Sequence, residues 1–269
     1  MNILKIMAFC LFGICVLGDA VAEQTVFVAG GSGRTGLAIV EVLSNAGYHV
    51  LASTRNAERA RQKYGDAIDW VEVDLLDTTR LVDAVKGADF VVSAVGHGDF
   101  VGVEAPQFVA YLAIRNLVDA AKAAQVKQVV LISSATAGHV RGVDHRNEAR
   151  FGFVLYWMTK GEDYLRASGL PYTIIGPGGL ANDFMANLIG FDLEASKTWG
   201  VKLLPRPEYK QAFVSRSGVA YVIDKALKDP SARNKAVAVI WDKSVPASTV
   251  TGSYAAIPEE VPTRSYLTP

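Results

Sequence analysis

The sequence has little of what several functional classes require. Only two of its 269 residues are cysteines, Cys10 and Cys15, and both lie within the first 22 residues. The chain beyond that segment therefore has no disulfide, no catalytic thiolate and no cysteine-based zinc site, and we expect no metal. The 27 basic residues are balanced by 27 acidic ones, so no general basic surface is available for nucleic acid. A disordered chain is excluded as well, because 50% of the residues are hydrophobic.

The first 22 residues have the pattern of a secretory signal peptide. Lys5 supplies a positive charge, residues 6–17 form an apolar run, and Ala20-Val21-Ala22 places small residues before Glu23. Twelve apolar residues are too few to cross a bilayer of about 30 Å comfortably as a helix. We expect residues 1–22 to be cleaved when the protein is exported to the periplasm or secreted. The alternative is an uncleaved segment that tethers the protein to a membrane.

Short β-branched runs alternate with segments of helical periodicity from residue 24 onward. The predicted strands are residues 25–29, 49–53, 68–73, 90–93, 128–133, 172–175 and 236–241. Near-continuous apolar strands separated by helices indicate a parallel sheet that is covered on both faces. The prediction is a single doubly wound α/β domain over residues 23–245, followed by a C-terminal tail, residues 246–269, that is exposed and lies along the domain.

A glycine-rich turn joins the first predicted strand to the first helix. Glycines in this position allow a tight turn and a close approach of backbone N–H groups to a pyrophosphate. The N-terminus of the following helix adds partial positive charge. A Walker-type phosphate loop is excluded because no Gly-Lys-Ser/Thr follows. We assign this turn to a dinucleotide, with a plain structural turn as the alternative; the residues concerned are Gly30, Ser32, Gly33, Arg34, Thr35 and Gly36.

The end of the second strand favours NADP over NAD as that dinucleotide. A site for NAD places Asp or Glu about 20 residues beyond the glycines to hold the ribose hydroxyls. This sequence has Ser53-Thr54-Arg55 there and no carboxylate. The guanidinium of Arg55 can bind a 2′-phosphate in a bidentate manner, and Arg34 can reach the same phosphate. The alternative is that both arginines are solvated surface residues.

The ends of the third and fourth strands complete the predicted nucleotide site. Asp74 follows the third strand and can accept a hydrogen bond from the adenine amino group, while the backbone N–H of Leu75 faces the ring. Asp74 could instead cap the next helix, although Asp77 is better placed for that role. After the fourth strand, the small residues Ala94 and Gly96 allow the backbone to pass close to a ribose.

These motifs resemble those of the short-chain dehydrogenase/reductase superfamily. They are most similar to its atypical NAD(P)-binding branch, which includes NmrA-like sensors and the biliverdin-IXβ/flavin reductases. The motifs that carry the resemblance are GGSGRTG (30–36), VEVDLLD (71–77), VVLISSATAG (129–138) and LRASGLPYTIIGPGGL (165–180). The resemblance covers roughly residues 25–242. It implies a Rossmann fold and hydride transfer from a nicotinamide cofactor.

The resemblance also implies a serine, a tyrosine and a lysine that act on a carbonyl or alcohol. Ser134 matches the serine after the fifth strand, and Tyr156 and Lys160 match the Y-x-x-x-K pair, whose spacing puts both residues on one helix face. Tyrosine, with an ordinary pKa of about 10, must exchange a proton near neutral pH. The lysine assists that exchange and binds the nicotinamide ribose. The spacing is weak evidence, because Tyr221 and Lys225 repeat it without the surrounding motif, so Tyr156 could be an ordinary packed aromatic residue.

The sequence departs from the family pattern at Gly176, where relatives usually carry an arginine, so a contact near the cofactor or substrate is expected to be missing. Residues 139–153 are charged and form either a mobile flap over the site or a solvated loop. Residues 182–207 form an irregular apolar-rich segment that is expected to influence substrate choice. Four of its side chains line a pocket for a flat substrate or else belong to the core: Phe184, Met185, Phe191 and Trp199.

The sequence therefore predicts an NADP-dependent oxidoreductase that transfers hydride to a small carbonyl, quinone, flavin or tetrapyrrole-like acceptor. The alternative is a non-catalytic NAD(P)-binding sensor or assembly factor, and an epimerase-like reaction that retains its nucleotide is a third hypothesis. The expected partner is a small-molecule substrate, and the protein is expected to be a monomer or a homodimer. Export conflicts with all three hypotheses, because NADP is scarce outside the cytoplasm.

Overall fold

A computed structural model describes residues 23–96, 101–138, 153–183, 186–187 and 190–259. The predicted signal peptide lies outside the described residues, as do residues 139–152 of the predicted flap and the two side chains Phe184 and Met185. Among the described residues, no helix combines the length and the apolar character that crossing a membrane requires.

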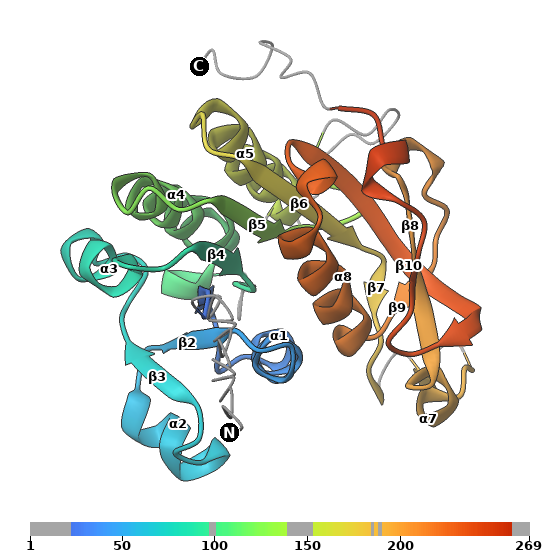
Figure 1. The fold of residues 1–269 in the computed structure, drawn as a ribbon, viewed down its shortest axis with the longest axis horizontal. Helices are drawn as coiled ribbons and strands as arrows, with labels where there is room; N and C mark the ends of the chain where they lie inside the picture. The colour runs from blue at the N-terminus through green and yellow to red at the C-terminus, as the bar shows by residue number, and fades with distance from the viewer. Residues whose placement is uncertain (1–22, 97–100, 139–152, 184–185, 188–189, 260–269) are drawn as a thin grey trace, which may run out of the picture.

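The fold is built on a nine-stranded, mostly parallel sheet with the strand order β11-β8-β10-β6-β5-β4-β1-β2-β3 (Figure 1). Its strands are β1 (Thr25–Ala29), β2 (His49–Thr54), β3 (Asp69–Glu72), β4 (Phe90–Ser93), β5 (Gln128–Ile132), β6 (Tyr172–Pro177), β8 (Trp199–Pro205), β10 (Lys235–Pro246) and β11 (Val250–Thr251). A second, two-stranded sheet pairs β7 (Gly179–Leu180) with β9 (Phe213–Val214). All seven predicted strands are present, and the prediction of a doubly wound Rossmann-like domain is confirmed.

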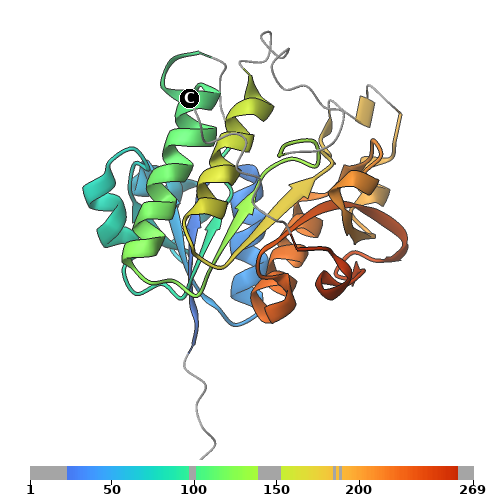
Figure 2. The ribbon, with the colours of Figure 1, turned by 90° about the horizontal axis from the view of Figure 1, so that it is seen from above.

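Helices cover both faces of the sheet (Figure 2). The α-helices are α1 (Arg34–Asn45), α2 (Ala57–Tyr64), α3 (Thr78–Val85), α4 (Ala113–Ala123), α5 (Val154–Ala167), α7 (Leu193–Ser196) and α8 (Arg216–Lys228). Shorter helical turns are η1 (Gly102–Glu104), the π-helix η2 (Gln107–Leu112), η5 (Arg206–Glu208), η6 (Pro230–Ala232) and η7 (Tyr254–Ala256). Successive side chains of a strand point to opposite faces, so Val26 and Val28 pack on the side of α1 and α8, whereas Phe27 and Ala29 pack on the side of α3, α4 and α5.

The segment 182–207 is not wholly irregular, because it contains the strand β8. This strand pairs antiparallel with β10, and Gly200 lies opposite Asp242. A Cβ atom on Gly200 would lie 2.6 Å from the carbonyl oxygens of Pro246 and Thr249, so the strand can approach that turn only through glycine. The sequence WGVKLLP has no clear alternation of apolar and polar residues, and the strand was therefore missed.

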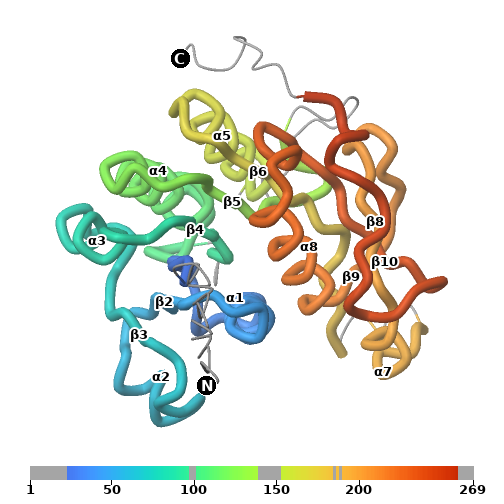
Figure 3. Tube along the Cα trace, in the orientation of Figure 1, coloured from blue at the N-terminus to red at the C-terminus, as the bar shows by residue number. Residues whose placement is uncertain are grey.

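The described part of the predicted tail, residues 246–259, lies along the domain and is not exposed throughout. Strand β11 pairs with β8 in this stretch, and the red part of the chain accordingly runs beside β8 in Figure 3. The Tyr254 side chain is fully buried, and its hydroxyl donates to the Val222 carbonyl at 3.1 Å. Lys225 Nζ donates to the carbonyls of Val250 and Gly252 at 3.2 and 2.9 Å. The second Y-x-x-x-K pair in the sequence therefore contributes a lysine that anchors the C-terminal segment.

Candidate active site

The glycine turn after β1 leaves no room for side chains at its critical positions. Gly30 has a φ of +76°, and its N–H donates to Ser53 Oγ at 3.0 Å. The turn is closed by the Gly33 N–H, which donates to the Gly30 carbonyl at 3.0 Å. A Cβ atom on Gly36 would overlap that same carbonyl oxygen, and one on Gly31 would lie 2.8 Å from the Cβ of Ala52. The turn therefore packs closely against β2 and against the start of α1, and a tight glycine turn between strand and helix is typical of dinucleotide-binding sites.

Helix α1 begins directly after this turn without a side-chain cap. Gly33 occupies the N-cap position, and no acidic residue lies in the first turn of the helix. The first N–H groups of a helix have no partner within the helix, and together they carry partial positive charge. The start of α1, which includes Arg34 and Thr35, is therefore suited to an anionic phosphate group.

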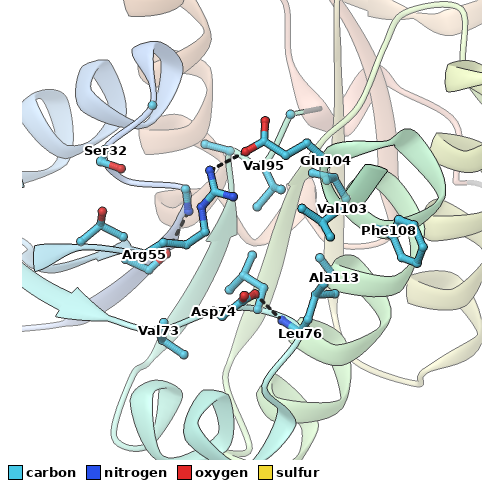
Figure 4. Close-up of a pocket in the computed structure, with 18 residues that line it drawn as sticks. Ser32, Arg55, Val73, Asp74, Leu76, Val95, Val103, Glu104, Phe108 and Ala113 are labelled. Carbon is cyan, nitrogen blue, oxygen red and sulfur yellow. Dashed lines mark hydrogen bonds and ion pairs between the residues drawn. The ribbon is translucent and has the colours of Figure 1, made fainter. Parts of the chain in front are cut away.

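A cavity of about 310 Å³ lies at the ends of β1 to β4, next to the glycine turn (Figure 4). Eight of the residues predicted to bind the cofactor line it together: Gly30, Ser32, Gly33, Arg55, Asp74, Leu75, Ala94 and Gly96. The opposite wall is formed by residues of η1, η2 and α4, which the sequence did not indicate: Val103, Glu104, Phe108, Val109 and Ala113. The structure thus brings distant residues into one cavity, and their binding of a nucleotide remains a prediction.

The floor of the cavity is held by hydrogen bonds at the end of β3. Asp74 Oδ1 accepts the N–H of Leu76 at 2.9 Å, and Asn116 Nδ2 donates to the Leu75 carbonyl at 3.0 Å. The N-cap of α3 is Asp77, whose carboxylate accepts the Arg80 N–H at 3.1 Å. The capping role is therefore filled by Asp77, which leaves Asp74 at the wall of the cavity.

A second cavity, of about 260 Å³, adjoins the first at the end of β2 and carries positive charge. Arg55, Arg59 and Lys63 line it, together with Ser32, Thr54, Asn56, Ala60 and Tyr64. The sequence indicated Arg55 but missed Arg59 and Lys63, although their i, i+4 spacing on α2 places them on one helix face.

Arg34 is not among the residues that line either of these cavities. It lies near Arg216 at the start of α8, where burial and then the charge of Arg34 lower the pKa of Arg216. Contact between Arg34 and a 2′-phosphate therefore has no direct support from this arrangement.

The predicted tyrosine and lysine lie together on α5. Lys160 Nζ is 5.8 Å from the centroid of the Tyr156 ring, and both side chains are half-buried. The Tyr156 ring also packs edge-on against Trp157, with the ring centroids 5.0 Å apart. The i, i+4 spacing thus places both residues on one side of the helix, and their catalytic roles remain predictions.

The loop with Ser134 is tied to α5. The N–H of Gly138 donates to Thr159 Oγ1 at 2.9 Å, and Thr159 directly precedes Lys160 in the helix. Ser134 Oγ accepts the N–H of Thr136 at 3.3 Å and lies 3.2 Å from Thr136 Oγ1. The loop that presents the serine is therefore positioned by the helix that carries the tyrosine and lysine.

A buried carboxylate beneath this loop joins three parts of the chain. Glu162 of α5 is fully buried, and its two oxygens accept from Arg206 Nη1 and Nη2, both at 2.9 Å. Arg166 donates to the same carboxylate at 3.0 Å, and Arg206 Nη1 also donates to the Ala137 carbonyl at 3.2 Å. Burial alone raises the pKa of Glu162, but the two guanidinium groups outweigh burial and hold the pKa at about 2.

At Gly176, where the sequence departs from the family pattern, there is no room for a side chain. A Cβ atom on Gly176 would lie 2.7 Å from the Ser134 carbonyl oxygen and 2.9 Å from Ala135 Cα, so β6 passes directly against the serine loop. A guanidinium that does lie beside this loop is that of Arg206 of η5, in the segment after β8. The sequence could not reveal this residue, because its partner Glu162 lies 44 positions away.

The described aromatic side chains of the segment 182–207 pack against other aromatic residues. Phe191 and Trp199 each meet Trp241 edge-on, with ring centroids 5.2 and 5.0 Å apart. Phe191 also packs on Phe213 at 5.7 Å. This arrangement favours the packing alternative over a substrate pocket for Phe191 and Trp199.

Together, the fold and the glycine turn define a dinucleotide-binding domain of the Rossmann type. Residues 30–230 match the model of the family described as NAD(P)H-binding, and the chain therefore belongs to this NAD(P)H-binding family. The resemblance inferred from the motifs is confirmed at this level.

Relatives of the chain include proteins of different size. An uncharacterized chloroplastic protein of Arabidopsis thaliana is 29% identical over 89% of this chain and 84% of its own length. Sanguinarine reductase of Eschscholzia californica is 27% identical over 82% of this chain and 90% of the enzyme. Protein TIC 62 of Pisum sativum is 32% identical over 62% of this chain, but the match spans only 35% of TIC 62.

Among solved structures, the anaerobillin reductase ChuY of Escherichia coli has a TM-score of 0.62 and 22% identity. The match covers 81% of this chain and 97% of the ChuY chain, and it shows the fold.

Replacing Glu162 by Gln should destabilise the protein strongly. The substitution leaves the buried guanidinium of Arg206 without its carboxylate partner and leaves Arg166 with Asp163 alone, and an uncompensated buried charge costs on the order of 3–5 kcal/mol. Unfolding by urea at neutral pH measures this loss. The control is Glu194→Gln, because Glu194 pairs with Lys197 on the surface, where an ion pair is worth less than about 1 kcal/mol. Losses of equal size in the two variants would contradict the assignment.

The stability of the wild type and that of Glu162→Gln should also depend differently on pH in the acid range. The pKa of Glu162 is about 2 in the folded state, below its ordinary value of 4.5. Its contribution to the free energy of unfolding is therefore complete above pH 4.5 and is lost as the pH falls toward 2. The wild-type protein should lose more stability than Glu162→Gln across that window.

Proposed function

We propose that this protein is an NADPH-dependent reductase of a small carbonyl, quinone, flavin or tetrapyrrole-like acceptor. The observation that carries the proposal is the position of Tyr156 and Lys160 on the helix that holds the Ser134 loop, in a chain of the NAD(P)H-binding family. A relative that matches most of this chain is named as a reductase of sanguinarine, which supports reduction of a small organic molecule.

The proposed preference for NADPH rests on the basic cavity at the end of β2. Its lining includes Arg55, Arg59 and Lys63 and no carboxylate. A 2′-phosphate carries two negative charges near neutral pH and would be held there by charge-assisted hydrogen bonds. NAD would find no acidic residue at the end of β2 to accept its ribose hydroxyls, because that position is Arg55.

In the proposed reaction, bound NADPH supplies the hydride. The Ser134 hydroxyl would orient the substrate oxygen by a hydrogen bond, and Tyr156 would donate the proton that this oxygen takes up. The positive charge of Lys160, which lies 5.8 Å from the tyrosine ring, would stabilise the phenolate left behind. The lysine would also bind the ribose hydroxyls beside the nicotinamide.

Removing the two basic residues of α2 should weaken NADPH binding selectively. An exposed contact between opposite charges is worth up to about 1 kcal/mol, so the loss of two such contacts in Arg59→Ala/Lys63→Ala should weaken NADPH binding by about 5- to 30-fold, as measured by isothermal titration. NADH lacks the phosphate, and its affinity should change by less than about threefold. Arg61→Ala is the matched control, because Arg61 lies on the same helix but does not line the cavity. Equal losses for both nucleotides would contradict the preference.

Turnover should depend on Tyr156 and Lys160. Loss of a general acid costs about 10²- to 10⁴-fold in kcat, so Tyr156→Phe should lower NADPH oxidation by that factor while NADPH binding is retained. Lys160→Ala should lower kcat and weaken NADPH binding as well. The assay uses sanguinarine, a quinone, FMN and biliverdin as acceptors, and Tyr221→Phe, from the other Y-x-x-x-K pair, is the control.

The same assay tests the non-catalytic alternative. The packing of Tyr156 against Trp157 is the observation behind that alternative, because an aromatic residue without a catalytic role would pack in the same way. NADPH binding without oxidation in the presence of any of these acceptors would support a sensor or assembly factor. Unchanged turnover in Tyr156→Phe would show that the catalytic assignment is wrong.

We also propose that residues 1–22 are a targeting segment that is removed when the protein reaches its compartment. The apolar run and the small residues before Glu23 support this proposal, as do relatives that are chloroplastic proteins. N-terminal sequencing of the protein isolated from its own cells should give Glu23 as the first residue. A sequence that begins at Met1 would contradict cleavage and favour a tether.

A further inference from the structure

Arg55 lies at the boundary between the two cavities. It lines both of them, as do Ser32 and Thr54. Its guanidinium extends across the larger cavity, where Nη2 donates to Glu104 Oε1 at 2.7 Å (Figure 4). The arginine proposed to bind the 2′-phosphate therefore already has an anionic partner within the protein.

Glu104 can make this contact because it lies on the wall of the larger cavity opposite Arg55. It ends the helical turn η1, which follows β4, whereas Arg55 follows β2. Of the residues that line the two cavities, only Asp74 and Glu104 are acidic. One oxygen of Asp74 accepts the Leu76 N–H. Glu104 forms an ion pair with Arg55 that joins the wall at the end of β2 to the wall at η1.

A carboxylate and a phosphate use the same donors of a guanidinium group. The side chains of Arg55 and Glu104 are 68% and 37% exposed, so water screens their attraction and the pair can exchange partners. While the pair is intact, the guanidinium of Arg55 is committed to Glu104. The charge of Glu104 also repels an incoming phosphate.

We propose that Glu104 limits the preference for NADPH over NADH, because its carboxylate competes with the 2′-phosphate of NADPH for Arg55. The inference rests on the proposed function, because it presumes that a 2′-phosphate enters the basic cavity. Arg59 and Lys63 line that cavity without forming the wall of the larger one, so they provide the initial attraction. Arg55 completes the site when it exchanges Glu104 for the phosphate. The carboxylate thus lowers the affinity for NADPH and leaves that for NADH nearly unchanged.

The test measures two small nucleotides by isothermal titration, adenosine 2′,5′-bisphosphate and adenosine 5′-diphosphate. An exposed ion pair changes an equilibrium constant by up to about fivefold, and loss of the repulsion adds to that factor. Glu104→Gln should therefore bind the bisphosphate about three- to tenfold more tightly than the wild type. Binding of the diphosphate should stay within about twofold of the wild type.

Two further variants separate competition from a general effect of charge. Glu58→Gln removes an exposed carboxylate of α2 that accepts a hydrogen bond from Gln62 and does not contact Arg55, and it should bind the bisphosphate as the wild type does. In an Arg55→Ala background, Glu104→Gln should give no gain beyond that of removing the repulsion, less than about threefold.

Several outcomes would overturn the inference. Weaker bisphosphate binding by Glu104→Gln would mean that Glu104 orients Arg55 for the phosphate, and equal gains for both nucleotides would mean that only overall charge matters. If the wild type and all variants bind neither nucleotide, the inference and the proposed nucleotide site both fail. If the expected gain is seen but NADPH is never oxidised, the reductase proposal fails alone and the role of Glu104 stands.

Discussion

The buried carboxylate of Glu162 is the constraint on which the arrangement around the candidate active site depends. A fully buried charge is tolerated only when it is paired and hydrogen-bonded, and Glu162 obtains its partners from Arg166 on its own helix and Arg206 of η5. Because Arg206 also donates to Ala137, neutralising one charge joins α5, the Ser134 loop and the segment after β8. A Cβ atom on Gly138 would lie 2.5 Å from Arg206 Nη1, so the loop must be glycine there.

The proposed nucleotide site, at the glycine turn and the two cavities beside it, is built in a contrasting way. Close backbone packing forms the glycine turn, and the charged groups around it are largely exposed. Arg55 and Glu104 make the same kind of ion pair as Arg206 and Glu162, but in water such a pair is weak and can exchange its partners. Burial makes the Arg206–Glu162 pair a fixed contact between η5 and α5. Exposure leaves the arginine of the Arg55–Glu104 pair available to a ligand.

Local patterns in the sequence predicted much of the fold, whereas contacts between distant residues were missed. The seven strands and the glycine turn were recognisable because periodicity and glycine spacing are properties of adjacent residues. Strand β11 lies in a Pro-, Ser- and Thr-rich stretch whose composition suggested an exposed tail, yet Tyr254 is fully buried there. The sequence did not point to Glu104 either, because its proposed role depends on contact with Arg55, which lies 49 residues away.

The buried and the exposed ion pair also serve different steps of the proposed reaction. The proposed proton transfer would require Ser134, Tyr156 and Lys160 to keep a fixed geometry. The helix and loop that carry these residues are joined through Glu162 and the Gly138–Thr159 hydrogen bond. Nucleotide exchange requires contacts that break in every cycle, and the cations at the end of β2 are exposed. On the proposed model, a substitution at the exposed Arg55 or Glu104 would change the choice of nucleotide at little cost in stability. A substitution at the buried Arg206 would instead disturb the loop that presents the serine.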